Sequence, residues 1–107
     1  MINTVDVALS GTFDSLGGYV TIDGTKYTSA QTLTVAKGTG VKVYCGGYHP
    51  VSQEIAYINL NGTNVAQGTT STAAEYTFAV TDNCTVVLSK GTYYGNEYYS
   101  AAITMPA

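Results

Sequence analysis

The residues with the clearest potential for chemistry are Cys45, His49 and Cys84. The spacing Cys45-x-x-x-His49 is one that a metal ion can use, and Cys84 could supply a third ligand. A structural zinc site needs four ligands in a closed tetrahedron, and the sequence contains no second histidine and no further cysteine. We therefore expect no metal and no other cofactor, and we interpret His49 as a loop residue before Pro50.

The two cysteines raise a second question, which is whether they form a disulfide. Cys45 and Cys84 share the parity of the apolar residues around them, so both are expected to face the core. If their two hairpins stack in opposite directions, the sulfur atoms lie at the same level. If the hairpins stack in the same direction, roughly 15 Å separates them. The sequence leaves both arrangements open.

Catalytic arrangements are hard to assemble from the remaining polar residues. Nucleophilic catalysis needs a base beside a nucleophile, and the expected strands bring no serine and acid next to the one histidine. Glycoside chemistry needs paired carboxylates. The candidate carboxylates fall on separate strands or loops: Asp14, Glu54, Glu75 and Glu97. We predict that the chain is not an enzyme.

Tyrosine is the remaining signal, because the 107 residues include ten Tyr and no Trp. Tyrosine offers rigid, amphipathic contact area at a low entropic cost, and sugar rings stack well on its face. The alternative role is packing, since alternate side chains of a strand face the core and exposed tyrosines can serve cross-strand contacts. The candidate ligand-binding residues, all in or beside Gly-containing loops, are Tyr93, Tyr94, Tyr98 and Tyr48.

A near repeat indicates the elements that must position these residues. Residues 19–25 read YVTIDGT and residues 57–63 read YINLNGT. Each copy contains an Asx-Gly pair, which is the strongest short-range signal for a two-residue hairpin turn of type I′. A two-residue loop fixes the register of its strands. The buried pairs predicted in this way are Val20 with Tyr27 and Ile58 with Val65.

Each copy is followed by a further alternating apolar segment, which we interpret as a second hairpin with a three-residue loop. The predicted facing pairs are Leu33 with Val43 and Val35 with Val41 across 37–39, and Phe78 with Leu88 and Val80 with Val86 across 82–84. Alternating segments at residues 5–9 and 101–105 bring the total to about eight strands in two similar halves.

The fold class follows from this strand pattern, because no segment has the period of a helix. We expect one domain, residues 1–107. A single sheet of this size would leave an apolar face in water, so two sheets should pack face to face. We predict an all-β, immunoglobulin-like antiparallel β-sandwich. A small closed β-barrel is the alternative, since the same alternation serves both.

Three segments carry a resemblance to known modules: residues 18–27 (GYVTIDGTKY), 32–38 (TLTVAKG) and 41–44 (VKVY). They resemble PEGA-like and bacterial immunoglobulin-like sandwich modules, although the Pro-Glu-Gly-Ala signature itself is absent. With its Thr-, Ala-, Gly- and Tyr-rich remainder, the chain looks like such a module from a phage minor structural or tail protein. The resemblance implies virion assembly or weak attachment to a host surface, and it implies no catalytic chemistry.

Charge excludes two classes of partner. Only 10% of the residues are charged, the net charge is −3, and the four lysines are scattered along the chain. Binding to nucleic acid or to an anionic membrane surface requires clustered Lys or Arg, so we expect neither. No apolar run reaches the ~18 residues of a membrane-spanning helix.

Three functions are consistent with these observations. The first is a non-enzymatic structural or interaction module on a phage virion or tail, with other virion or cell-surface proteins as partners. The second is a carbohydrate-binding module that uses the tyrosines to hold a host surface glycan. The third is a secreted adhesion domain. The expected location is a virion or the extracellular cell surface, and exposed edge strands could pair copies of the chain into a homo-oligomer.

Overall fold

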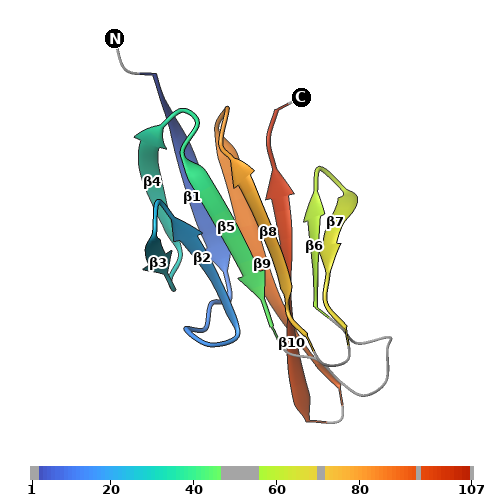
Figure 1. Cartoon of the computed structure of the whole chain (residues 1–107). Helices are drawn as coiled ribbons and strands as arrows, with labels where there is room; N and C mark the ends of the chain where they lie inside the picture. The colour runs from blue at the N-terminus through green and yellow to red at the C-terminus, as the bar shows by residue number, and fades with distance from the viewer. Residues whose placement is uncertain (1–2, 47–55, 70–71, 94, 107) are drawn as a thin grey trace.

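The computed structural model describes residues 3–46, 56–69, 72–93 and 95–106 as a two-layer β-sandwich (Figure 1). The described residues form ten strands and no helix, rather than the eight strands predicted. The sheets are open, so the barrel alternative is wrong. The six-stranded sheet has the order β4 (Gln31–Ala36), β1 (Thr4–Gly11), β9 (Cys84–Tyr93), β10 (Asn96–Thr104), β6 (Tyr57–Leu60), β7 (Thr63–Gln67). The four-stranded sheet has the order β3 (Thr25–Tyr27), β2 (Gly18–Ile22), β5 (Gly40–Cys45), β8 (Ala74–Ala79).

The two Asx-Gly turns form as predicted. Asp23 and Asn61 each have a φ of 50°, and the glycines that follow them also have positive φ, as a type I′ turn requires. In the first hairpin Val20 lies opposite Tyr27, which confirms the predicted register, although Tyr27 is only partly buried. In the second hairpin a bulge at Ile58/Asn59 places Ile58 opposite Ala66, so the predicted pairing with Val65 is wrong.

The two predicted three-residue hairpins are connections between the sheets instead. β4 pairs with β1 while β5 pairs with β2 and β8, so the chain crosses from one sheet to the other at residues 37–39. Residues 80–83, at the second predicted hairpin, likewise cross between the sheets, from β8 to β9. The two crossings bond to each other, because the Gly38 N–H donates to the Val80 carbonyl at 2.7 Å and the Val80 N–H donates to the Thr39 carbonyl at 3.0 Å.

The six-stranded sheet is mixed, because β1 pairs with β9 and β10 pairs with β6 in parallel, so the prediction of an antiparallel sandwich is wrong for this sheet. The four-stranded sheet is antiparallel, as predicted. Without β1 and β10, the six-stranded sheet has the order β7, β6, β9, β4, and the four-stranded sheet has the order β3, β2, β5, β8. Each strand in the first order corresponds to the strand at the same place in the second, so the two sheets share one strand order. The six-stranded sheet then contains two extra strands, with β10 between β6 and β9 and β1 between β9 and β4. The first and last described strands are therefore inserted into an order that the two sheets otherwise share.

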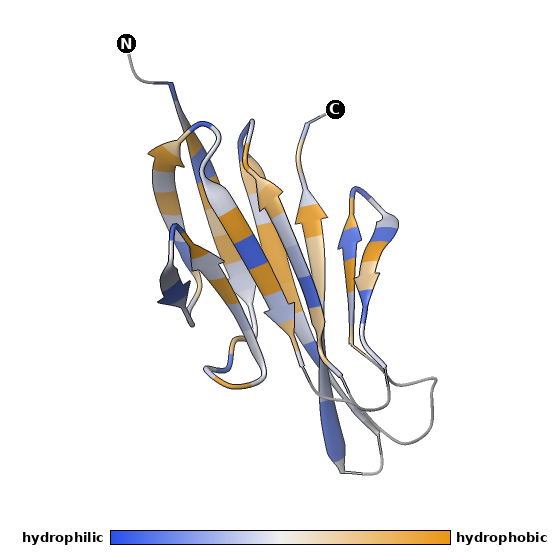
Figure 2. Cartoon of the chain, in the orientation of Figure 1, coloured by the Kyte–Doolittle hydropathy of each residue, from blue (hydrophilic) through white to orange (hydrophobic). Residues whose placement is uncertain are grey.

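The core lies between the layers and follows the alternation in the sequence, which is visible as apolar bands across the strands in Figure 2. Val20 and Ile58, which the repeat places at equivalent positions, are both fully buried. Burying a side chain of this size stabilises a fold by about 1.5–3 kcal/mol. The other largest fully buried side chains are Leu88, Ile103, Val7, Val41, Val43, Val80, Val86 and Cys45.

Candidate functional site

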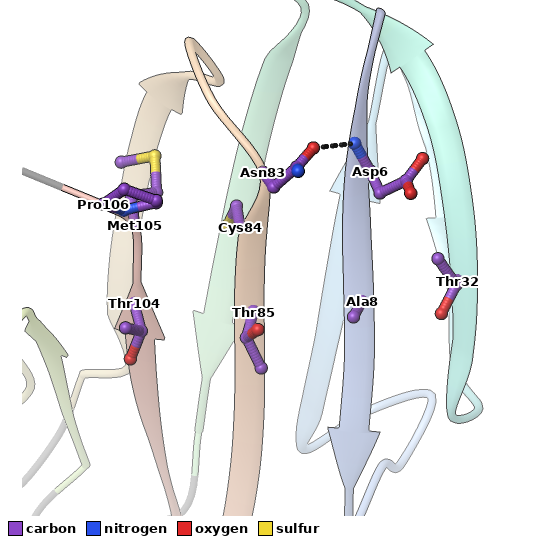
Figure 3. Close-up of a pocket in the computed structure, with 9 residues that line it drawn as sticks. All are labelled: Asp6, Ala8, Thr32, Asn83, Cys84, Thr85, Thr104, Met105 and Pro106. Atoms are coloured by element: carbon purple, nitrogen blue, oxygen red, sulfur yellow. Dashed lines mark hydrogen bonds between the residues drawn. The ribbon is translucent and has the colours of Figure 1, made fainter.

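A shallow groove crosses the outer face of the six-stranded sheet over β4, β1, β9 and β10 (Figure 3). Its volume is about 520 Å³, which is in the range of small-molecule sites. The pairing of the strands brings Thr32, Ala8, Thr85 and Thr104 into one row across the sheet. The small side chain of Ala8 lies between longer neighbours, and this difference in length produces the hollow.

One end of the groove carries oriented polar groups. The Asp6 N–H donates to Asn83 Oδ1 at 2.9 Å, and the Thr34 hydroxyl donates to Asp6 Oδ1 at 2.8 Å. The Asn83 N–H in turn donates to the Asp82 carboxylate at 2.7 Å. The carboxylate and the amide of this end are therefore held in place, and together with the threonine hydroxyls they can bind polar, uncharged groups. The sequence did not reveal this groove, because the parallel pairing of β1 with β9 is a long-range contact.

The strands β9 and β10 continue past the rest of the sheet as a two-stranded ribbon, at the lower end of Figure 1. β9 pairs with β1 only as far as Leu88, and β10 pairs with β6 only from Ser100 onward. The molecule is elongated as a result, with extents of 51 × 24 × 19 Å. The projecting part of β10 is hydrophilic (Figure 2).

The predicted tyrosine site maps only in part onto the described residues. Tyr98 lies opposite Gly91 on the ribbon, and a Cβ added at Gly91 would lie 2.5 Å from the Tyr98 hydroxyl oxygen. The Tyr98 ring therefore covers the glycine across the strand pair, which is a packing role for at least part of this side chain. The backbone of Tyr93 pairs with Asn96 in the same ribbon, whereas Tyr48 and Tyr94 lie outside the described residues.

Tyr99, the neighbour of Tyr98, anchors the ribbon to the body of the molecule. Its ring is buried against Gly17 and Gly18, where an added Cβ would lie 2.5 Å and 2.6 Å from ring atoms, and burial raises the pKa of its hydroxyl. Its N–H donates to the Gly46 carbonyl at 2.9 Å. Beside it, Lys90 pairs with Glu97 across the ribbon at 3.0 Å.

A second aromatic cluster, which the sequence did not reveal, covers the outer face of the four-stranded sheet. Tyr19 and Tyr44 lie opposite each other on β2 and β5, and their rings stack at 4.7 Å with an interplanar angle of 15°. The ammonium of Lys26 lies 4.1 Å from the centre of the Tyr19 ring, a cation–π contact. Tyr44 and Lys26 come from the strands on either side of β2, so we assign the Tyr19 ring to cross-strand packing.

The cysteines are free thiols, both buried. β5 and β9 run in the same direction in Figure 1, so Cys45 at the end of one strand and Cys84 at the start of the other lie at opposite ends of the core. Burial raises the pKa of Cys45 to about 12 and that of Cys84 to about 11, so neither is a reactive thiolate near neutral pH. Within the described residues, no three His, Cys, Asp or Glu side chains form a group that could hold a metal ion; His49 lies outside them.

The carboxylates have separate local roles. Asp14 accepts hydrogen bonds from the N–H groups of Leu16 and Gly17 at 2.8 and 2.9 Å, and these bonds hold the pKa of its carboxyl below its ordinary value. They order a loop that presents Leu16, which is 83% exposed. Glu75 pairs with Lys42 at 2.9 Å on the four-stranded sheet, and Glu54 lies outside the described residues.

Comparison with known proteins does not assign this chain to a family. No protein-family model, no curated protein and no solved structure matches it. None of the segments described here forms a helix long and apolar enough to cross a membrane. The shape and chemistry of the molecule's own surface are therefore the basis for a functional proposal.

Proposed function

We propose that this chain is a non-enzymatic structural or interaction module, an immunoglobulin-like sandwich of two similar halves, displayed on a phage virion or tail. The resemblance of residues 18–44 to bacterial immunoglobulin-like modules supports this proposal, as does the strand order that the two sheets share. The low charge and the Thr-, Ser- and Gly-rich composition are typical of extracellular β domains.

The observation that carries the proposal is the outer face of the six-stranded sheet. On the body of the sheet, up to Ser89 on β9 and from Ser100 on β10, the outward-facing positions of β4, β1, β9 and β10 carry only Thr, Ser, Ala and Val side chains apart from Asp6. Tyr98 lies beyond this part of the face, on the projecting ribbon. The charge of Asp6 is partly satisfied by Thr34 and lies at one end of the face. A surface of this kind can be covered by another protein with little burial of unpaired charge, which is costly in an interface. We propose this face as the contact with other virion or cell-surface proteins.

The experiment is to follow the protein into purified particles with two matched variants. Thr85→Arg places a charge in the middle of the proposed contact face, and Thr77→Arg places the same charge on the exposed face of the other sheet. We expect Thr85→Arg to lower incorporation, measured by quantitative mass spectrometry, by about tenfold or more, because it buries an unpaired charge. Thr77→Arg should incorporate like the native chain. Native protein that remains in the cytosol and never co-purifies with particles or cell envelopes would end the proposal.

Carbohydrate binding at the projecting ribbon is a second candidate function. It is favoured by one observation, which is that the ribbon bearing Tyr98 extends beyond the rest of the sheet, where a large ligand can approach it. Aromatic side chains on such a projection could stack on a host surface glycan.

The matched pair that tests this candidate is Tyr98→Leu and Tyr57→Leu. Leucine at position 98 keeps apolar cover over Gly91 but removes the aromatic face, and Tyr57, 39% exposed on the body of the sheet, serves as the control. If the ribbon binds sugars, Tyr98→Leu should weaken binding on a glycan array about three- to tenfold while Tyr57→Leu leaves it unchanged. A native chain without affinity for any glycan would eliminate the candidate.

A further inference from the structure

The four edge strands of the sandwich differ in how well they are protected against pairing with another strand. The edges of the four-stranded sheet carry charge, with Lys26 on the three-residue β3 and Glu75 on β8. On β7, Asn64 donates from its side chain to the Ala66 carbonyl of the same strand at 3.2 Å, and the pairing of β7 with β6 contains a bulge. Charges, short length and bulges are the usual devices that block an edge.

β4 has none of these devices. Its six residues, QTLTVA, contain no charge, no proline and no glycine, and its pairing with β1 is regular from end to end. Within the described part of the chain no strand lies on its other side. Leu33 and Val35 point toward the core but are only partly buried, because they lie at the rim of the sandwich. The edge therefore combines a strand side that no described strand pairs with apolar area that is only partly covered.

We infer that β4 is a self-association edge, at which a second copy of this chain adds its own β4 in antiparallel orientation across a two-fold axis. The inference rests on the proposed function for its setting, since it names how copies of a structural module contact each other. Antiparallel pairing of one strand with its own copy is symmetric, so a single surface is sufficient to close the dimer.

The sequence of β4 selects one register for this pairing. With Thr34 opposite its own copy, Leu33 lies opposite Val35 of the second chain, so the partly buried apolar residues cover each other on the core side. Thr32 then lies opposite Ala36, and Gln31 opposite Lys37, so no like charges meet. A slip by one residue would put apolar residues opposite outward-facing threonines. A slip by two in the direction that pairs Val35 with itself would put Leu33 opposite Lys37. A slip by two in the other direction would pair Leu33 with itself but put Val35 opposite the polar Gln31.

The contact is small, and this predicts its strength. One six-residue edge buries less area than a stable standard-size interface, so isolated dimers should be weak, with a Kd in the micromolar range or above. Weak pairing becomes effective when many copies are held close together, as on the surface of an assembly.

Cysteine cross-linking tests both the pairing and its register. In the proposed register the two copies of residue 34 are directly opposed, with Cα atoms about 4.5–5.5 Å apart, a separation that a disulfide can bridge. The two copies of residue 32 are offset by four residues, or roughly 13 Å along the strands, which is too far. The native cysteines are buried, so the native chain supplies the background.

We expect Thr34→Cys to form a disulfide-linked dimer under mild oxidation at least about tenfold faster than Thr32→Cys, because only the first pair is pre-aligned. Sedimentation of the native full chain up to about 1 mM should show a reversible dimer. A native chain that stays monomeric, or equal cross-linking of the two variants, would overturn the inference. Specific cross-linking by a protein that is absent from particles would overturn the proposed function and leave the edge pairing standing.

Discussion

Replacing Gly11 by alanine is expected to destabilise the fold by about 2–5 kcal/mol, because two independent costs add. The first cost is conformational: Gly11 has a φ of +98°, which L-residues rarely adopt. The second is steric: an added Cβ would lie 2.9 Å from the carbonyl carbon of Leu88, and closer still to its oxygen. A backbone carbonyl cannot rotate away as a side chain can, so the strand itself would have to move.

The position of Gly11 makes this movement costly. It ends the parallel pairing of β1 with β9, and the next residue, Thr12, donates its N–H to the same Leu88 carbonyl at 2.9 Å. Leu88 is one of the largest fully buried side chains. Any shift of the Leu88 backbone would therefore disturb a hydrogen bond and the core at once.

Gly24→Ala is the matched control, since Gly24 also has a positive φ, +83°, but an added Cβ there meets nothing within 4 Å. It carries only the conformational cost, about 1–2 kcal/mol. Urea unfolding followed by circular dichroism measures both variants. Gly11→Ala within about 1 kcal/mol of Gly24→Ala would show that the close approach to Leu88 has no energetic consequence.

The sequence predicts the fold where the decisive interactions are local. The pair Val20 with Tyr27 follows from the Asp23-Gly24 turn, because a two-residue loop leaves one register. The same rule predicts the wrong partner for Ile58 by one residue, because a bulge adds one residue to β7. The turn residues contain no signal for this bulge. The alternation of polar and apolar residues also identifies most of the core, although Leu33, Val35 and Phe78 are only partly buried.

Alternation does not decide which strands pair. Leu33 and Val43 point into the core whether their strands form a hairpin within one sheet or face each other from opposite sheets. The pattern is identical in the two cases, so the crossings at 37–39 and 80–83 could not be distinguished from hairpins. The insertion of β1 and β10 into the six-stranded sheet depends on parallel, long-range pairing, which no local residue signals.

For the candidate sites, too, the sequence predicts what depends on local residues and misses what depends on long-range strand pairing. The tyrosines are conspicuous in the sequence, and the prediction that Tyr48, Tyr93, Tyr94 and Tyr98 bind a ligand remains a prediction. The groove and the Tyr19–Tyr44 stack depend on which strands are neighbours, so they became visible only in the assembled sheets. Surface sites of a β-sandwich combine residues that are distant in the chain, and composition alone identifies few of them.

The two buried thiols predict a marked loss of stability in alkaline solution. Burial raises the pKa of Cys45 from 9.0 to about 12 and that of Cys84 from 9.0 to about 11. Below the pKa of the thiol in the unfolded chain, the thiol is neutral in both states and the folded state keeps its full stability. As the pH rises from there toward the pKa of the thiol in the folded state, the thiol ionises only in the unfolded chain, and the folded state loses stability. The loss therefore begins near pH 9 and continues to about pH 11 for Cys84 and about pH 12 for Cys45.

The expected magnitude follows from linkage. A thiol that ionises only in the unfolded chain costs up to about 1.4 kcal/mol of stability per pH unit, so the pair should cost roughly 2 kcal/mol between pH 9.5 and 10.5. Tyr99, whose pKa is also raised by burial, adds to the loss at the upper end of this range. Such a loss is a large share of the stability of a typical domain.

The measurement is urea unfolding at several pH values for the native chain and for the Cys45→Ala/Cys84→Ala variant. The variant starts less stable, because each substitution leaves a small cavity, but its stability should fall more slowly with pH since it has no thiol to ionise. The comparison of slopes cancels the cavity cost and the titration of the other tyrosines and lysines. Equal slopes for the two proteins would mean that the thiols ionise as readily in the folded core as in the unfolded chain, contrary to the burial of both side chains.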